Sequence, residues 1–111
     1  MRLLLRAMLP VLVAMGSFAV AGPGAAQPYD PVEMGQELVG MYCADCHAIA
    51  ATGQSPFPPA PPFRELQLRY DVELLNEALV EGLTAHPDMP EFEFDPEQAA
   101  AIIAYLKSFE P

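Results

Sequence analysis

The feature that most limits how this chain can fold is the segment Cys43-Ala44-Asp45-Cys46-His47, which holds its only two cysteines. At 111 residues the chain forms one small domain at most. Such a domain buries a modest apolar core and commonly needs a cross-link or a bound group for stability. A disulfide between Cys43 and Cys46 would close a very short loop, which in the chain-entropy model stabilises little. The two thiols are therefore expected to hold something other than each other.

The spacing Cys-x-x-Cys-His is typical of covalent haem c attachment. Each thiol can add to one of the two vinyl groups of a haem, and one helical turn roughly spans the separation of those groups. The adjacent imidazole of His47 is then placed to ligate the iron. We predict one haem c per chain, attached through Cys43 and Cys46 and ligated by His47.

Three other interpretations of the same segment compete with haem. A thioredoxin-like thiol pair requires a βαβ context, and no strand is expected before Cys43. A zinc site could use Cys43, Cys46, His47 and His86, but adjacent Cys46 and His47 cannot easily both reach a tetrahedral ion, and the zinc-finger spacing is absent. Two buried free thiols are the third alternative, and export to an oxidising compartment disfavours them.

The N-terminal residues 1–26 have the pattern of a secretory signal peptide. Arg2 and Arg6 precede an apolar run, and small residues follow, with cleavage predicted after Ala21 or Ala26. The apolar run is short for a membrane span, which takes about 20 residues. We expect a haem domain over residues 27–111, located in the periplasm and not bound to a membrane after cleavage. An uncleaved membrane anchor is the alternative.

The charge balance excludes one class of partner. The chain has five Lys plus Arg against fifteen Asp plus Glu, and only Arg64, Arg69 and Lys107 remain basic after the signal. Nucleic acid binding depends on positive charge that displaces counterions from phosphates, so no nucleic acid partner is expected. A basic protein partner fits the charge better.

Three helices and no strand are expected after the signal, so the predicted fold class is all-α. The helices span Pro31–Tyr42, Val72–Glu81 and Pro96–Phe109. Each follows an aspartate suited to cap it, namely Asp30, Asp71 and Asp95, and Gln98 completes a capping box with the last. Gly82 is the expected stop of the second helix. The apolar faces are Val32, Gly35, Val39 and Tyr42; Val72, Leu75 and Leu79; and Ala99, Ile102, Ile103 and Leu106, bordered by Tyr105.

Two irregular segments separate these helices. The first, residues 54–63, is rich in proline and carries Phe57 and Phe63, which indicates that it wraps around something. The second, residues 82–95, is long for a connection in a compact domain, and such loops are usually functional or disordered. Met89 in this loop is our candidate for the sixth iron ligand. The rival is His86, otherwise expected to be a solvated loop residue, and Met34 and Met41 are weaker candidates.

On these residues the chain resembles the class I cytochromes c, small carriers with one haem. The resemblance covers the whole mature domain, because a first helix, the Cys-x-x-Cys-His motif, a proline-containing loop, a middle helix, a Met-Pro loop and a last helix follow in the family's order. Gly35 matches the glycine of the family's first helix, whereas Val39 replaces a common aromatic. Ile102, Tyr105 and Leu106 match the last helix. The resemblance implies that the first and last helices cross near Gly35.

The resemblance also implies that a proline carbonyl accepts a hydrogen bond from the second ring nitrogen of His47. Pro61 and Pro62 are the candidates, and we favour Pro61. The residues expected to line the haem pocket are Tyr42, Phe57, Phe63, Leu66, Phe92, Phe94 and Leu106.

The function predicted from the sequence is one-electron transfer between redox proteins by a haem with His47 and Met89 as axial ligands. The protein is expected not to be an enzyme, to act as a monomer or as a subunit of a redox complex, and to meet partners with a basic docking face. The alternatives are a small peroxidase, the haem subunit of a periplasmic dehydrogenase, and a gas-binding sensor with a labile Met89.

Overall fold

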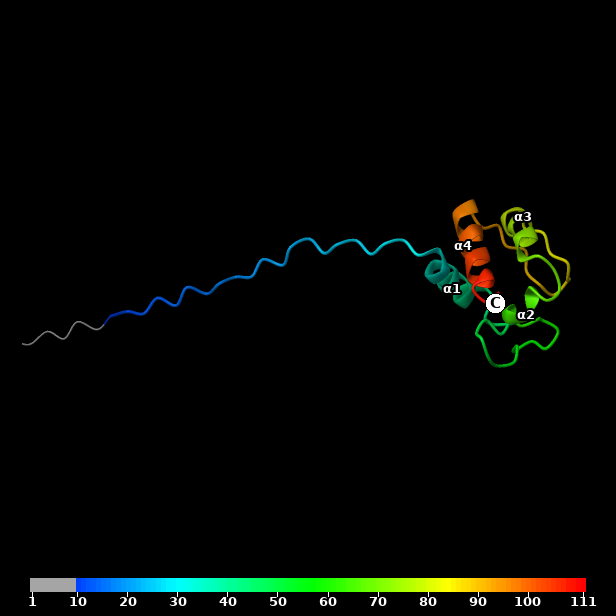
Figure 1. The fold of residues 1–111 in the computed structure, drawn as a ribbon, viewed down its shortest axis with the longest axis horizontal. Coiled ribbons are helices and arrows are strands. Elements are labelled where there is room, and N and C mark those ends of the chain that lie inside the picture. The colour runs from blue at the N-terminus through cyan, green and yellow to red at the C-terminus, as the bar shows by residue number, and fades with distance from the viewer. Residues whose placement is uncertain (1–9) are drawn as a thin grey trace, which may run out of the picture.

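The structure is a computed structural model that describes residues 10–111, and the first nine residues of the predicted signal peptide lie outside the described residues. Residues 10–30 form no helix or strand and lead to the folded domain as an extended segment (Figure 1). The signal peptide and its cleavage stay predictions. Among residues 10–111, no helix combines the length and the hydropathy that a membrane span requires.

The folded domain consists of helices and irregular segments (Figure 1). The helices are α1 (Pro31–Tyr42), α2 (Phe63–Leu66), α3 (Leu75–Glu81) and α4 (Pro96–Lys107), with a 3-10 turn, η1 (Val72–Leu74), directly before α3. Residues 10–111 contain no strand. The all-α prediction is confirmed.

The aspartates that precede the helices cap them as predicted. The Asp30 carboxylate accepts from the Val32 amide at 2.9 Å, and that of Asp95 accepts from the Gln98 amide at 2.8 Å. The Gln98 side chain in turn accepts from the Asp95 amide at 3.2 Å, which completes the capping box. These bonds satisfy amide groups that have no partner within their own helix.

Helix boundaries differ from the predictions in three places. The carboxylate of Asp71 accepts from the Glu73 amide, and the turn that follows is a 3-10 turn, so the α-helix starts only at Leu75. The last helix ends at Lys107 rather than Phe109. The short helix α2 was not predicted, because it follows directly on a proline run. The Pro62 carbonyl starts it by accepting from the Glu65 amide at 3.0 Å.

Helices α1 and α4 pack against each other at Gly35, as the family resemblance implied. A Cβ atom on Gly35 would lie 2.0 Å from the Ala101 carbonyl oxygen and 2.8 Å from the Tyr105 Cβ atom. Only a residue without a side chain permits this approach. The crossing fixes the C-terminal end of α1, and so the start of the cysteine segment, relative to α4.

The core around this crossing corrects the predicted face of α1. Leu38, absent from the prediction, is 4% exposed, whereas Val32 and Tyr42 are 36% and 47% exposed. Val32 lies in the first turn of α1, and Tyr42 in its last turn. On α4 the predicted face is confirmed, and Tyr105 is buried with it. The buried core consists mainly of Leu38, Val39, Phe63, Leu66, Val72, Phe94, Ala99, Ala101, Ile102, Ile103, Tyr105 and Leu106.

Candidate functional site

The cysteine segment continues directly from the C-terminal end of α1. Cys43 caps the helix, and its carbonyl accepts from the amides of Cys46 at 3.2 Å and His47 at 2.9 Å. This single turn places both cysteines on one side of the segment, with no disulfide between them. Burial, and secondarily the charge of Cys46, raises the pKa of Cys43 to about 11. A thiol with such a pKa stays protonated at neutral pH, unlike the activated thiolate of a thioredoxin-like pair.

The imidazole ring of His47 is held by the proline-rich loop. Its Nδ1 atom lies 2.7 Å from the carbonyl oxygen of Pro61, so Nδ1 carries the proton and donates. The Phe63 ring packs at 5.0 Å from the imidazole ring, measured between centroids. The second ring nitrogen, Nε2, therefore has a free lone pair and a fixed direction. A carbonyl partner of this kind orients a histidine ligand and raises its basicity.

Further hydrogen bonds tie the proline-rich loop to the cysteine segment. The Phe57 amide donates to the Cys46 carbonyl at 3.1 Å, and the Phe63 amide donates to the Ala48 carbonyl at 2.9 Å. The Ser55 hydroxyl accepts from the Ala48 amide at 3.0 Å. Proline has no amide hydrogen, so the few other residues of the loop supply its donors. These hydrogen bonds hold the loop against the segment that carries His47.

Two side chains outside the loop complete this support. The hydroxyl group of Tyr105, on α4, donates to the carbonyl oxygen of Ile49, two residues after His47. The guanidinium group of Arg64, on α2, donates to the carbonyl of Gly53 at 2.8 Å. Both contacts connect the loop region to helices of the core, and sequence reasoning identified neither of them.

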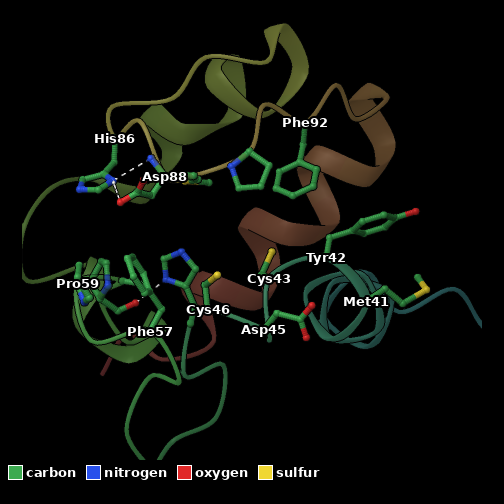
Figure 2. A pocket seen from close by; sticks show the side chains of 15 residues that line it. Met41, Tyr42, Cys43, Asp45, Cys46, Phe57, Pro59, His86, Asp88 and Phe92 are labelled. Atoms are coloured by element: carbon green, nitrogen blue, oxygen red, sulfur yellow. Dashed lines mark hydrogen bonds and ion pairs between the residues drawn. The ribbon is translucent and has the colours of Figure 1, made fainter.

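A cavity of about 430 Å³ lies between these segments (Figure 2). This volume falls in the range of about 300–1,000 Å³ that is usual for cofactor sites. The end of α1 and the cysteine segment contribute Met41, Tyr42, Cys43, Asp45, Cys46 and His47. The proline-rich loop contributes Phe57, Pro59, Ala60 and Pro61. The loop after α3 contributes His86, Asp88, Met89, Pro90 and Phe92.

The loop that carries Met89 is anchored at its two ends. The Leu83 amide donates to the Ala78 carbonyl at 2.9 Å, and the Phe94 amide donates to the Leu79 carbonyl at 3.0 Å. At the tip, the Met89 amide donates to the His86 carbonyl at 3.1 Å. Met89 is 36% exposed. The loop thus brings the Met89 side chain to the same cavity as His47.

His86 lies on the same loop as an exposed residue, as expected. Its Nδ1 atom accepts from the Asp88 amide at 3.2 Å. In Figure 2 the His86 ring lies beside Asp88 at one side of the cavity, away from Cys43 and Tyr42 at the other side. With Nδ1 accepting a hydrogen bond, Nε2 of the neutral ring carries the hydrogen, so the neutral ring as placed offers no free lone pair.

An aromatic cluster closes one wall of the cavity. The ring of Tyr42 lies at 6.0 Å from that of Phe92 and at 5.4 Å from that of Phe94, both edge to face, measured between centroids. Phe92 and Phe94 are stacked at 5.6 Å. Such contacts join the end of α1 to the loop before α4.

The structure places some of the residues predicted to line the haem pocket at this cavity and others in the core. Tyr42, Phe57 and Phe92 line the cavity. Phe63, Leu66, Phe94 and Leu106 do not line it and are buried in the core instead, at 3% to 7% exposure. Periodicity identifies apolar residues, but it does not separate those that face another helix from those that face a bound group. Phe63 contacts the site indirectly, through its packing against the His47 ring.

The residues at the cavity fit a covalently attached haem. Two adjacent thiols, one imidazole with a free Nε2 and one thioether sulfur from a facing loop form the donor set of a c-type haem with His and Met ligands. The zinc alternative is not supported, because no three His, Cys, Asp or Glu side chains within residues 10–111 are grouped to hold a metal ion. The thioredoxin-like alternative lacks its βαβ context throughout the described residues.

Comparison with known proteins agrees with this geometry. A family model described as Cytochrome c matches residues 32–110, which include helices α2, α3 and α4 and all of α1 except its first residue, Pro31. No curated protein and no solved structure gave a match. The cytochrome c family carries covalently bound haem c, and its members are generally electron carriers rather than enzymes. The chain therefore belongs to the class I cytochromes c, and its family function is haem-based electron transfer.

Proposed function

We propose that this protein is an exported one-electron carrier with one haem c, attached through Cys43 and Cys46 and ligated by His47 and Met89. The observation that carries the proposal is the hydrogen bond from His47 Nδ1 to the Pro61 carbonyl, at 2.7 Å. It leaves Nε2 free beside a cavity that Met89 also lines. When bound, the haem supplies a reversible Fe(III)/Fe(II) couple. A Met/His ligand pair raises the potential of that couple relative to two histidines.

The protein's own part is attachment, orientation and exclusion of water. Cys43 and Cys46 would hold the haem through two thioether bonds, each formed by addition of one S–H group across one vinyl group, which needs no oxidant. The Pro61 carbonyl keeps the His47 ring in one orientation, so the ring need not reorient when an electron is gained or lost at the site. Tyr42 and Phe92 cover the cavity with apolar surface and limit the access of water.

The first test is the state of the exported protein in a host that matures c-type cytochromes. We expect a red protein whose intact mass equals the cleaved chain plus one haem, with both thiols resistant to alkylation after denaturation. An intact mass that matches a chain cleaved after Ala21 or after Ala26 would support the predicted signal cleavage. A colourless product with two alkylatable thiols would refute the proposal.

The sixth ligand is tested with Met89→Ala. We expect an altered absorption spectrum in both oxidation states and a lower reduction potential, because the thioether ligand is lost. Met41→Ala is the matched control, since Met41 lines the same cavity and is 66% exposed. Unchanged spectra for Met89→Ala, or an equal change for Met41→Ala, would show that the ligand assignment is wrong.

A second candidate function is reversible binding of a small gas at the iron. The loop around Met89 favours it, because between Leu83 and Phe94 its hydrogen bonds are internal, such as that from the Met89 amide to the His86 carbonyl. Carbon monoxide added to the reduced protein separates the two functions. Rapid binding would favour the gas-binding function, and absence of binding would favour electron transfer.

A further inference from the structure

We propose that Arg64 is a positioning residue for His47. By holding residues 50–53 against α2, its guanidinium group keeps the Pro61 carbonyl within hydrogen-bond distance of the imidazole ring. This inference rests on the proposed function, because the residue that Arg64 positions is the iron ligand assigned there. Three observations support it, namely the two carbonyls that Arg64 binds, the backbone conformation at one of them, and the place of Arg64 directly after Phe63.

Arg64 binds two backbone carbonyls through two different nitrogens. Its Nη2 atom donates to the Gly53 carbonyl at 2.8 Å, and its Nη1 atom donates to the Ala50 carbonyl at 3.4 Å. The acceptors lie 11 and 14 residues before Arg64, so the side chain closes this stretch of chain onto α2. The chain has fifteen Asp plus Glu, yet Arg64 forms no ion pair within residues 10–111. Its planar fork of donors therefore serves to hold backbone.

The backbone at Gly53 is shaped to meet this side chain. Gly53 has a φ of 97°, in the left-handed region that residues with a side chain rarely adopt. A Cβ atom there would meet nothing within 4 Å, so it is the conformation, and not lack of space, that favours glycine. The carbonyl of this bend accepts the shorter of the two Arg64 hydrogen bonds. The bend and the arginine together fix the path of residues 50–53.

The segment that carries the Pro61 carbonyl has few hydrogen bonds of its own. Four of the five residues between Phe57 and Phe63 are proline, which has no amide hydrogen. The exception is Ala60, whose amide donates to the Phe57 carbonyl at 2.9 Å. The position of this segment therefore depends on contacts made at its two ends, and Arg64 supplies them at one end.

Arg64 stands next to the contacts that act directly on the imidazole ring. The Phe63 ring packs at 5.0 Å from the His47 ring, and the Phe63 amide donates to the Ala48 carbonyl at 2.9 Å. Two residues before Phe63, the Pro61 carbonyl accepts from His47 Nδ1 at 2.7 Å. A side chain that fixes the loop relative to α2 therefore also fixes the distance from Nδ1 to its acceptor.

The sign of a change in reduction potential separates positioning from a simple charge effect. The hydrogen bond to Pro61 raises the basicity of His47, and a more basic ligand favours Fe(III). A longer hydrogen bond should therefore raise the potential. Loss of a positive charge near the haem acts in the opposite direction, because a cation disfavours Fe(III) by Coulomb repulsion.

The test uses the matured, haem-containing protein and compares Arg64→Met with Arg69→Met. Arg69 is an exposed residue on the turn after α2, so the control removes the same charge from a nearby site. Exchange of the His47 Nδ1 hydrogen is followed by nuclear magnetic resonance in the reduced state. The reduction potential is measured by spectroelectrochemical titration, and far-UV circular dichroism checks that each variant is folded.

We expect Arg64→Met to speed exchange of the Nδ1 hydrogen roughly three- to tenfold and to raise the potential. Arg69→Met should leave the exchange rate unchanged and lower the potential slightly. Arg64→Lys should change both quantities in the same direction as Arg64→Met but less, because an ammonium group keeps the charge without the planar fork. An unchanged exchange rate in Arg64→Met, or a potential lowered as in Arg69→Met, would overturn the proposal.

Gly53→Ala tests the same contact from the acceptor side. Alanine disfavours the left-handed conformation at this position, so the variant should also speed exchange of the His47 Nδ1 hydrogen and raise the potential. Wild-type values of both quantities in Gly53→Ala would overturn the proposal even if Arg64→Met fails to mature. A colourless wild-type protein would refute the proposed function itself. A red wild-type protein whose variants show no change would refute only the role of Arg64, so the two failures are distinguishable.

Discussion

Gly35 of α1 lies against Ala101 of α4 so closely that a Cβ atom at position 35 would stand 2.0 Å from the Ala101 carbonyl oxygen. No rotamer change relieves such a clash, because the opposing atom belongs to the backbone. The two helices would have to separate, and with them the end of α1 that leads into Cys43. This one contact therefore connects the packing of the fold to the position of the haem-binding segment.

Gly35→Ala is expected to destabilise the protein by at least about 3 kcal/mol, at the upper end of overpacking costs. Gly40→Ala on the same helix is the matched control, because nothing lies within 4 Å of a Cβ atom there. It should be neutral, or stabilising by up to about 1 kcal/mol, since alanine favours a helix over glycine. Urea unfolding followed by far-UV circular dichroism measures both, as the chain has no tryptophan. Similar stabilities for the two variants would contradict the close crossing.

Tyr105 should make the free energy of unfolding depend on pH in the alkaline range. Burial raises the pKa of Tyr105 above its ordinary value of 10.0. The unfolded chain therefore loses this proton at lower pH than the folded one. The stabilisation from Tyr105 is complete below pH 10.0 and is lost as the pH rises through the raised pKa of the folded state. Tyr105→Phe should remove this part of the pH dependence and also cost about 1 kcal/mol at neutral pH, through the lost bond to Ile49.

The measurement is urea unfolding at several pH values between about 8 and 11, around the ordinary tyrosine pKa. Tyr29→Phe is the control, since Tyr29 is 59% exposed in the segment before α1. If the Tyr105 and Tyr29 variants lost stability in parallel as the pH rises, the buried hydroxyl would not be the source of the effect.

Ser55→Ala should loosen the loop that holds His47. The Ser55 hydroxyl accepts from the amide of Ala48, which is 8% exposed, so the substitution leaves a buried donor without its partner. Such a loss costs about 1–3 kcal/mol. Hydrogen exchange of the Ala48 amide should accelerate accordingly. Thr52→Ala, at an exposed position of the same segment, is the control, and equal exchange rates in the two variants would refute this role.

Cys43→Ser/Cys46→Ser should yield a chain from which acidified organic solvent extracts any haem. The remaining protein would then keep its cavity of about 430 Å³ without the haem. This cavity is open to solvent, so its apolar lining, including Tyr42 and Phe92, would face water instead of haem, which costs about 25 cal/mol per Å² of apolar surface. In a small domain of marginal stability, we expect a marked loss of helical circular dichroism. Native helix content in the haem-free chain would show that the domain folds stably without the haem.

The sequence was most informative where the interactions are local. The start of α1 at Pro31 and of α4 at Pro96 followed from the aspartate before each proline, because a capping side chain bonds to amides only two or three residues ahead. The segment from Cys43 to His47 was recognisable for the same reason, since the spacing of its two cysteines and its histidine is by itself the pattern of haem c attachment. The 3-10 turn at Val72 and the short helix at Phe63 were harder to predict, because single turns leave little periodicity.

What the sequence by itself determined is the helical class, the caps and the attachment motif, since each depends on residues within one or two turns of one another. The tertiary structure decided which apolar side chains face the cavity and which face the core, as Phe92 and Phe94 illustrate with opposite outcomes two positions apart. It also selected Pro61 over Pro62 as the partner of His47 and brought residues from three separate segments of the chain to one cavity. These outcomes depend on how segments distant in the chain pack around the Gly35 crossing, and packing is a property of the whole domain.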